Sequence, residues 1–286
     1  MPPQAIPPQK RMTCMLGHPV AENPIDRMFD AVFAHYGLPW QFWKCDVGSE
    51  ERIAAAIAGV RALGFAGACI TVPYKVASIP HLDAVDGDVQ AIGAANYVTV
   101  DDGRLVGHNN DGKGVVKAIE KVTPIRGKRV VMLGAGGAGR AMAVELAWAG
   151  ASHLTVVTRR ESQGVEVAAL VTRASGVPSE WMPWAGEVRI PDGTQLLMNA
   201  THLGAAPELA PVSVNWGSVS GGTTVVDVIT NPRITPFLKT ARDRGCRTVD
   251  GVEMLVQLAM QIFERWTGIG PAEDVFQLAV GQALGE

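Results

Sequence analysis

The chain has 286 residues, of which 47% are hydrophobic, and its 25 Lys and Arg residues nearly balance 28 Asp and Glu residues. A chain of this length can bury two cores of ordinary domain size, and two domains create a cleft between them. The sequence has no basic block interleaved with aromatic residues and no apolar run of membrane-spanning length, so we expect a small-molecule partner, no nucleic acid and no membrane.

The first third of the chain alternates between strand and helix patterns. Residues 1–10 are rich in proline and lack an apolar segment, so we expect a short disordered tail and no signal peptide. The apolar patterns then predict a strand at 11–17, a helix at 24–38, a strand at 40–47, a helix at 49–64 capped by Ser49, and a strand at 65–72. This β-α-β-α-β order predicts a mostly parallel sheet.

The next segment connects this sheet to a second unit. It contains a short helical piece at 86–93 and two β-prone runs within 95–109, joined by the Asp-Asp-Gly hairpin signal at 101–103. Residues 111–122 predict a connecting helix.

The second unit opens with a strand, a glycine-rich turn, a helix and a strand within residues 127–160. Gly134, Gly136 and Gly139 form G-x-G-x-x-G between an apolar strand and a helix, which is the context of a dinucleotide fingerprint. Glycines let the backbone approach a pyrophosphate, whose charge is met by free N–H groups and the helix dipole. The alternative is a tight turn without a ligand.

Two further strands, at 194–201 and 223–230, continue this unit. They are followed by a long helix at 250–268 whose apolar positions exceed one stripe. We therefore expect this helix between layers or at the junction between domains.

The residues that follow the strand at 153–158 indicate which dinucleotide binds. An NAD site places Asp or Glu there for the ribose 2′-hydroxyl, whereas this chain has Thr158, Arg159 and Arg160. Guanidinium groups bind phosphate well, so the pattern favours NADP over NAD. Glu161 follows directly, and its pairing with an arginine is an alternative.

Lys75 follows a run of small and β-branched residues at 68–72. Most lysines near strand ends reach into water. The alternative is a lysine held at the carboxyl end of a strand, where open α/β sheets place ligands and where an amine can transfer protons. The strand pattern alone leaves both interpretations open.

The cysteines and histidines show no metal or disulfide pattern. The four cysteines contain no Cys-x-x-Cys pair, which fits a cytoplasmic protein, and the six histidines have no spacing typical of a metal site. We therefore expect no metal.

Eight short motifs then occur in an order that is typical of one family. They are GHPV at 17–20, TVPYK at 71–75, IGAAN at 92–96, NNDGKG at 109–114, GAGGAGRA at 134–141, NAT at 199–201, NPRITP at 231–236 and DGVEMLV at 250–256. On these motifs the chain resembles the shikimate dehydrogenase family over almost its whole length. The resemblance implies a two-domain α/β fold, with a β-α-β substrate domain at 1–113, a Rossmann-type NADP domain at 114–250 and C-terminal helices at 251–286 that return to the first domain.

The resemblance also implies an activity and its residues. The family's enzymes are NADP-dependent oxidoreductases of aromatic amino acid biosynthesis that interconvert a ring hydroxyl and a ketone of shikimate or a related cyclic hydroxy acid. Lys75 and Asp111 match the catalytic pair, and Thr71 and Asn96 match contacts to substrate hydroxyls. Burial would favour a neutral Lys75 and a nearby Asp111 would favour its charged form, so its protonation state stays open. An alternative for Asp111 is the N-cap of the helix that follows.

The cofactor contacts implied by the resemblance lie in the glycine-rich turn, after the strand at 153–158 and at four later positions. They are Gly134, Ala135, Gly136, Gly137, Ala138, Gly139, Thr158, Arg159, Arg160, Thr201, Val228, Gly251 and Met254.

The chain departs from the family pattern where the substrate carboxylate binds. The family's Ser-x-Ser pair is replaced by Asn23-Pro24-Ile25, and its Asn, Tyr and Gln at three other positions are replaced by Cys69, Thr230 and Leu258. We expect the hydride-transfer end of the pocket to be kept and the carboxylate end to be rebuilt. Shikimate would then bind poorly, and a ring with a less polar substituent would fit better.

Two kinds of alternative remain. The substrate of the enzyme could instead be of the quinate or aminoshikimate kind. A non-catalytic protein that binds NADPH or a small acid is the alternative outside enzymes, although a sensor has no need of Lys75 and Asp111. The chain would act as a monomer or a homodimer.

Overall fold

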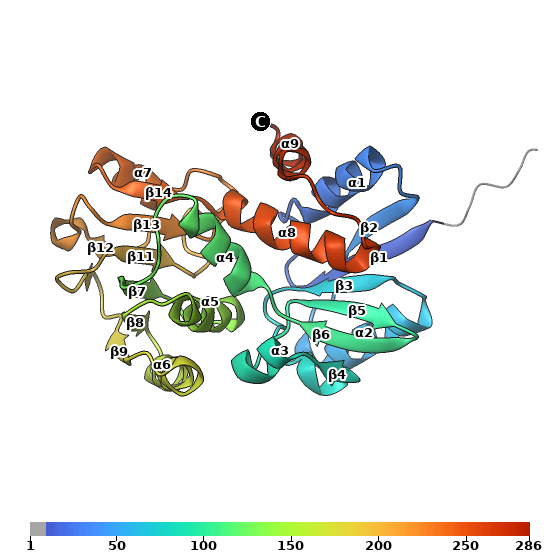
Figure 1. Cartoon of the computed structure of the whole chain (residues 1–286), viewed down its shortest axis with the longest axis horizontal. Helices are drawn as coiled ribbons and strands as arrows, with labels where there is room; N and C mark the ends of the chain where they lie inside the picture. Colours follow the sequence, from blue (N-terminus) through green and yellow to red (C-terminus); the bar gives the residue numbers. More distant parts are fainter. Residues whose placement is uncertain (1–9) are drawn as a thin grey trace, which may run out of the picture.

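The computed structural model describes residues 10–286, so nearly all of the predicted tail lies outside the described residues. Two six-stranded sheets lie side by side, with the helices α4 (Asp111–Glu120) and α8 (Gly251–Thr267) between them (Figure 1). The predicted α/β fold with two sheet-based units is confirmed. Within residues 10–286, no helix combines the length and the apolar character needed to cross a membrane.

The first sheet has the strand order β2-β1-β3-β5-β6-β4. Three of its five strand pairings are parallel, which confirms the predicted mostly parallel sheet, and the antiparallel pairs come from the predicted hairpin. The hairpin turns at Asp102 and Gly103, both with positive φ, as a two-residue turn requires. The strands are β1 (Arg11–Gly17), β2 (Trp40–Asp46), β3 (Gly67–Ile70), β4 (Ala84–Val85), β5 (Tyr97–Asp101) and β6 (Arg104–His108).

Helices on this sheet form where apolar residues recur with helical spacing. Helix α1 (Ile25–His35) buries Met28, Phe29, Val32 and Phe33 on one face. The other helices are η1 (Glu50–Arg52), α2 (Ile53–Ala62), η2 (Ile79–His81) and α3 (Gly87–Ile92).

The predicted cap at Ser49 is wrong. The chain first forms the tighter turn η1, and α2 begins only at Ile53. The Ser49 side chain makes no capping hydrogen bond and contacts the Glu51 carboxylate instead.

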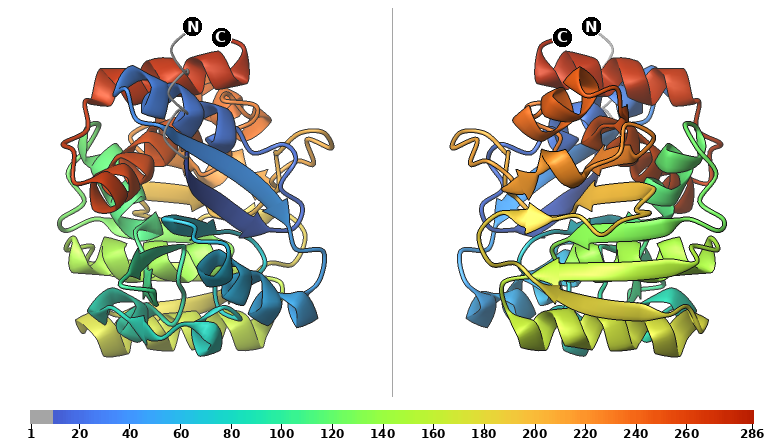
Figure 2. Two further views of the ribbon diagram at one scale, coloured as in Figure 1. Left: turned by 90° about the vertical axis from the view of Figure 1, so that its right-hand side faces the viewer. Right: turned by 90° about the vertical axis from the view of Figure 1, so that its left-hand side faces the viewer.

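The second sheet is entirely parallel, in the order β14-β13-β11-β7-β8-β9. From β7 the chain adds strands first on one side and then on the other, so β7 lies at the switch point where open sheets bind ligands. Figure 2 shows the two sheets from opposite ends of the molecule. The strands are β7 (Arg129–Leu133), β8 (His153–Thr158), β9 (Ser179–Pro183), β11 (Leu196–Asn199), β13 (Thr224–Asp227) and β14 (Arg247–Val249), beside a small pair β10 (Val188–Arg189) and β12 (Val214–Asn215).

Helices cover this second sheet as well. They are α5 (Gly137–Trp148), α6 (Glu161–Ser175), α7 (Pro236–Asp243) and the short turn η3 (Trp216–Ser218). The strands and helix around the glycine-rich turn were predicted from the sequence, whereas α6, α7, β9 and β14 were not.

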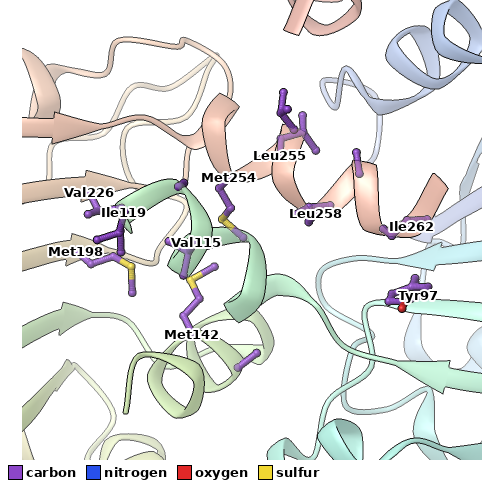
Figure 3. Close-up of a cluster of buried hydrophobic side chains, with 14 of the residues drawn as sticks. Tyr97, Val115, Ile119, Met142, Met198, Val226, Met254, Leu255, Leu258 and Ile262 are labelled. Carbon is purple, nitrogen blue, oxygen red and sulfur yellow. The ribbon is translucent and has the colours of Figure 1, made fainter. Parts of the chain in front are cut away.

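Helices α4 and α8 pack against each other at the junction of the two units, where the helix at 250–268 was expected. Gly114 allows this approach, because a Cβ there would lie 3.0 Å from the Leu258 Cβ. Gly112 likewise allows α4 to approach α5, because a Cβ there would lie 2.5 Å from the Ala141 oxygen. Figure 3 shows Val115 of α4 between Met142 of α5 and the apolar side chains of α8.

The final helix α9 (Glu273–Leu284) lies beside α1, although the two helices come from opposite ends of the sequence (Figure 1). The Phe276 ring packs edge-on to Phe29 of α1, with ring centroids 6.5 Å apart. In α8, the Trp266 ring nitrogen donates to the Val98 carbonyl oxygen at 3.1 Å. The C-terminal helices thus pack against the first sheet and its helix α1.

Candidate active site

A cavity of about 190 Å³ opens where the two units face each other. It lies at the carboxyl ends of β1 and β3, beside the start of α5 and along α8. The structure brings together there the predicted catalytic pair and all six predicted substrate positions. These are Lys75, Asp111, Asn23, Ile25, Thr71, Asn96, Thr230 and Leu258.

Lys75 and Asp111 form a buried ion pair. The Lys75 Nζ donates to the Asp111 Oδ2 at 2.5 Å, and the two residues are 8% and 3% exposed. Of the two interpretations of Lys75, the one in which it reaches into water is therefore wrong. Asp111 is not the N-cap of α4 either, because Asn110 occupies that position and both Asp111 oxygens are bound by other side chains.

Amide side chains hold this carboxylate in place. The Asn96 Nδ2 donates to the Asp111 Oδ1 at 3.0 Å and to the Asn110 Oδ1 at 2.8 Å. The Asn109 Oδ1 accepts from the Asp111 backbone nitrogen at 3.1 Å, and the Asn110 Nδ2 donates to the Leu258 carbonyl oxygen at 2.9 Å. Asn109 and Asn110 were not predicted as site residues, although two amides directly before Asp111 were a signal for such a role.

Asn23 lies just before α1, and its side-chain oxygen is hydrogen-bonded within its own turn. Its Oδ1 accepts from the Ile25 backbone nitrogen at 3.0 Å, and its carbonyl oxygen accepts from the Lys44 Nζ at 3.1 Å. The Asn23 side-chain NH₂ group has no hydrogen-bond partner among the described residues, so it can donate to a ligand.

An apolar wall faces this polar group of residues. Ile25, Cys69 and Leu258 are 4%, 4% and 8% exposed and line the cavity. Burial raises the pKa of the Cys69 thiol, so it is neutral. Five further lining residues were not predicted, although they lie on the apolar faces of their elements: Met15, Ile70, Met142, Leu255 and Ile262.

The glycine-rich turn has the shape of a phosphate-binding loop. Gly134 has φ of +100°, and Gly136 precedes α5 without a side-chain cap, so the first N–H groups of α5 face open space. A Cβ on Gly136 would meet no atom within 4 Å, whereas a Cβ on Gly137 would lie 2.9 Å from the Lys75 Cβ. The turn therefore fits a pyrophosphate on its open side and packs against Lys75 on the other.

Two guanidinium groups extend from the end of β8. Arg159 and Arg160 are exposed, and the Arg160 side chain donates to the Gln163 Oε1 at 3.1 Å. Gln163 in turn donates to the carbonyl oxygen of Ala135 in the glycine-rich turn, at 2.9 Å. Glu161 forms no ion pair with either arginine in the described structure, so both positive charges are available to a phosphate.

Four of the remaining predicted cofactor positions line the cavity. Ala138, Val228, Gly251 and Met254 line the cavity, and Thr201 packs on the glycine-rich turn, its Cγ2 lying 2.7 Å from where a Cβ on Gly134 would be. Thr158 is buried and its hydroxyl donates to the Arg160 carbonyl oxygen at 2.8 Å. A Cβ on Gly251 would lie 2.3 Å from the Ile229 oxygen, so α8 can begin here only with glycine.

No group of three or more metal-binding side chains is assembled anywhere in residues 10–286. All four cysteines are free thiols.

Comparisons with known proteins agree on one family. Residues 15–98 match the model of the shikimate dehydrogenase substrate binding domain. A shikimate dehydrogenase (NADP+) from Moorella thermoacetica is 38% identical over 96% of this chain and 94% of its own length.

Two solved structures are similar over nearly the whole chain. A ligand-free 5-ketofructose reductase from Gluconobacter sp. strain CHM43 is 40% identical with a TM-score of 0.87, over 96% of this chain and 99% of that one. A shikimate dehydrogenase in complex with NADP+ is 29% identical with a TM-score of 0.89, over 97% of this chain and 96% of that one.

Proposed function

The chain belongs to the shikimate dehydrogenase family, and we propose that it is an NADP-dependent oxidoreductase that interconverts a ring hydroxyl and a ketone. The substrate class of the family is shikimate or a related cyclic hydroxy acid. The observation that carries the proposal is the buried pair Lys75–Asp111, which lines the substrate cavity and packs against the glycine-rich turn through Gly137.

The pair supplies the proton that the reaction needs. NADPH, when bound, supplies the hydride that reduces the carbonyl carbon. As negative charge develops on the carbonyl oxygen, the Lys75 ammonium donates a proton to it: an N–H bond breaks and an O–H bond forms. Lys75 then regains a proton from solvent, and alcohol oxidation follows the same steps in reverse.

Asp111 and Asn96 act by orientation. The Asp111 carboxylate holds the Lys75 Nζ at 2.5 Å, and Asn96 and Asn109 hold Asp111. Because these groups are set in position before the reaction, little reorganisation is needed as charge develops. Thr71 lines the same cavity as Lys75, so its hydroxyl can contact a substrate hydroxyl.

The cofactor residues support NADP. The open side of Gly136 and the N-terminus of α5 suit the pyrophosphate, and Arg159 and Arg160 suit the 2′-phosphate. The curated relatives are named for NADP+.

A second candidate is the reduction of a sugar ketone by the same residues. The solved structure that is 40% identical is named a 5-ketofructose reductase, and 5-ketofructose carries no carboxylate. The apolar side chains of Ile25 and Leu258 favour this candidate, because neither can hydrogen-bond a carboxylate.

We place the protein in the cytoplasm, which agrees with four free thiols. One chain contains every residue of the proposed site, so a monomer and a homodimer would both be active.

The test is a turnover screen at the absorbance of the reduced nicotinamide. The purified chain is offered NADP+ with shikimate, quinate and aminoshikimate, and NADPH with 3-dehydroshikimate and 5-ketofructose. We expect steady-state turnover of at least one of these compounds. Tight NADPH binding without turnover of any of them would contradict the enzyme and support the binding protein.

A further inference from the structure

The substrate cavity has a polar side and an apolar side. Lys75 and Asp111 mark the polar side, where the reacting hydroxyl lies in the proposed function. Ile25, Cys69 and Leu258 belong to the apolar side and come from α1, β3 and α8. An apolar cavity of about 150 Å³ can bind benzene, so a cavity of about 190 Å³ has room for one small ring with its substituents. Such a ring touches both sides at once.

The charged side chains of the lining neutralise each other. Within the described residues, Lys75 and Asp111 are the charged groups that line the cavity, and they are paired at 2.5 Å. Lys44 lies near Asn23 but is not part of the lining. Its ammonium donates to the carbonyl oxygens of Ala21 and Asn23 and pairs with the Asp26 carboxylate at 3.3 Å. The cavity therefore offers no unpaired positive charge to an anion.

Neutral donors in the lining are few. Both hydrogens of the Asn96 amide are taken, by Asn110 and by Asp111. The side-chain NH₂ group of Asn23 and the hydroxyls of Thr71 and Thr230 remain. These groups can serve the hydroxyls of a ring. A carboxylate has about four lone-pair sites and loses strong bonds to water on entry, which one amide does not restore.

Gln257 does not compensate for Leu258. The two residues are adjacent on α8, and neighbours on a helix point about 100° apart. Leu258 lines the cavity together with Met254 and Ile262, one helical turn away on each side, and Gln257 is not part of the lining. Figure 3 shows Met254, Leu258 and Ile262 along one side of α8.

We infer that the preferred substrate is a neutral ring, a cyclic polyhydroxy ketone or its alcohol without a carboxylate, and that Ile25 and Leu258 determine this preference. The ring places its reacting hydroxyl at Lys75 and Asp111 and a C–H edge against Ile25 and Leu258. This inference rests on the proposed NADP-dependent function.

The most direct test compares shikimate with methyl shikimate, which has the same ring and hydroxyls but no charge. Both are assayed as alcohol substrates with saturating NADP+. We expect the ester to have a kcat/KM about ten- to hundredfold higher, mainly through a lower KM, because its ester group keeps no charge that needs pairing. 5-Ketofructose with NADPH is the second neutral probe, and we expect it to be turned over.

Two variants add donors to the apolar wall, and a third serves as a control. Ile25→Ser and Leu258→Gln should each shift the ratio of kcat/KM for shikimate to that for the ester toward shikimate, by about tenfold. Leu258→Met keeps the wall apolar at similar volume and should leave the ratio unchanged. The comparison in the unmodified protein stands even if a variant fails to fold.

The outcomes separate the inference from the function on which it rests. A kcat/KM for shikimate equal to or above that of the ester in the unmodified protein overturns the neutral-ring inference and leaves the oxidoreductase intact. No turnover of shikimate, its ester, 5-ketofructose or any other compound of the screen overturns both. Turnover of the ester well above that of the acid, with the preference reduced by Leu258→Gln, supports both.

Discussion

At the scale of single residues, the positive charges at the end of β8 define the expected cofactor. Arg159 is exposed and has no ion pair in the described structure, while Arg160 is hydrogen-bonded to Gln163. A 2′-phosphate would gain a charge-assisted bond from such a guanidinium, whereas the 2′-hydroxyl of NAD would gain much less.

Replacing Arg159 by Ala should therefore weaken NADP binding about tenfold and change NAD binding little. The dissociation constants of both dinucleotides can be measured by titration calorimetry. Arg173→Ala, at the opposite end of α6, is the matched control and should change neither. Equal affinities for NADP and NAD in the unmodified chain would contradict the assignment.

The sequence indicated the reacting residues of the site more readily than those that hold them. Lys75, Asp111, Asn96 and Asn110 all lie in motifs, but the roles of the two amides in holding Asp111 depend on hydrogen bonds across 14 residues of chain. Only part of the apolar side of the cavity could be predicted. In the sequence, Met15 and Ile262 have the pattern of ordinary core positions, and only the fold brings β1 and α8 together at the cavity.

At the scale of elements, the glycine-rich turn connects the two halves of the site. Gly136 faces open space, and Gly137 packs on Lys75. The two glycines are neighbours in the chain, yet a methyl group on Gly136 would affect cofactor binding and one on Gly137 would affect the position of Lys75.

Gly136→Ala should keep the thermal midpoint, because its Cβ would meet no atom within 4 Å, but should weaken NADP binding about tenfold or more, since the Cβ enters the space for the pyrophosphate. Gly137→Ala should instead lower kcat by about ten- to a hundredfold, because its Cβ would lie 2.9 Å from the Lys75 Cβ and displace that lysine. Dinucleotide titration and steady-state kinetics on both variants separate these effects. The same phenotype in both would contradict the distinct roles.

The end of β13 contains a buried acid that makes stability depend on pH. Burial raises the pKa of Asp227 from 3.8 to about 6, although Thr235, Asn199 and the Ile229 nitrogen donate to its carboxylate. Between these pH values the folded state holds a proton that the unfolded state has lost. Stability therefore falls as pH rises from about 4 to 6 and levels off above that.

Between about pH 4 and 6, Asp227 should lower the free energy of unfolding by about 3 kcal/mol. Asp227→Asn removes the titrating group. The unfolding free energy of this variant should therefore lack the decline that Asp227 causes between pH 4 and 6. Urea titrations at a series of pH values measure both profiles. A variant that retains the full decline between pH 4 and 6 would show that another group causes it.

Elements with a strong local signal were predictable, and short or late elements were not. The hairpin at 95–109 and the unit at 127–160 carry a turn signal or a glycine pattern, and both formed. Strands β9 and β14 are edge strands with partly exposed residues, so their apolar pattern is weak. Ser49 had the sequence of a cap, but the turn η1 intervenes before α2.

At the scale of the whole molecule, the end of the chain completes the core around α1. The side chain of Phe276 in α9 is fully buried, and its ring contacts Phe29 and Phe263, with centroids at 6.5 and 5.6 Å. The division of the chain into 1–113, 114–250 and 251–286 stays a prediction.

Phe276→Ala should destabilise the protein by about 3 to 5 kcal/mol, because it leaves a cavity between α9, α1 and α8. Leu278 lies on the same helix but is 64% exposed, so Leu278→Ala should change the unfolding free energy by less than about 0.5 kcal/mol. Denaturant titration compares the two. A Phe276→Ala variant as stable as Leu278→Ala would contradict a structural role for α9.

The two units of the molecule meet at the cavity that contains Lys75 and Asp111, which we propose as an NADP-dependent active site. The most direct measurement is kcat of Lys75→Ala with the compound that the unmodified chain turns over fastest. We predict a decrease of about two to four orders of magnitude with a smaller change in KM. Lys113→Ala is the control, since Lys113 pairs with Asp88 outside the cavity, and it should keep kcat near that of the unmodified chain. An unchanged kcat in a folded Lys75→Ala variant would contradict the account.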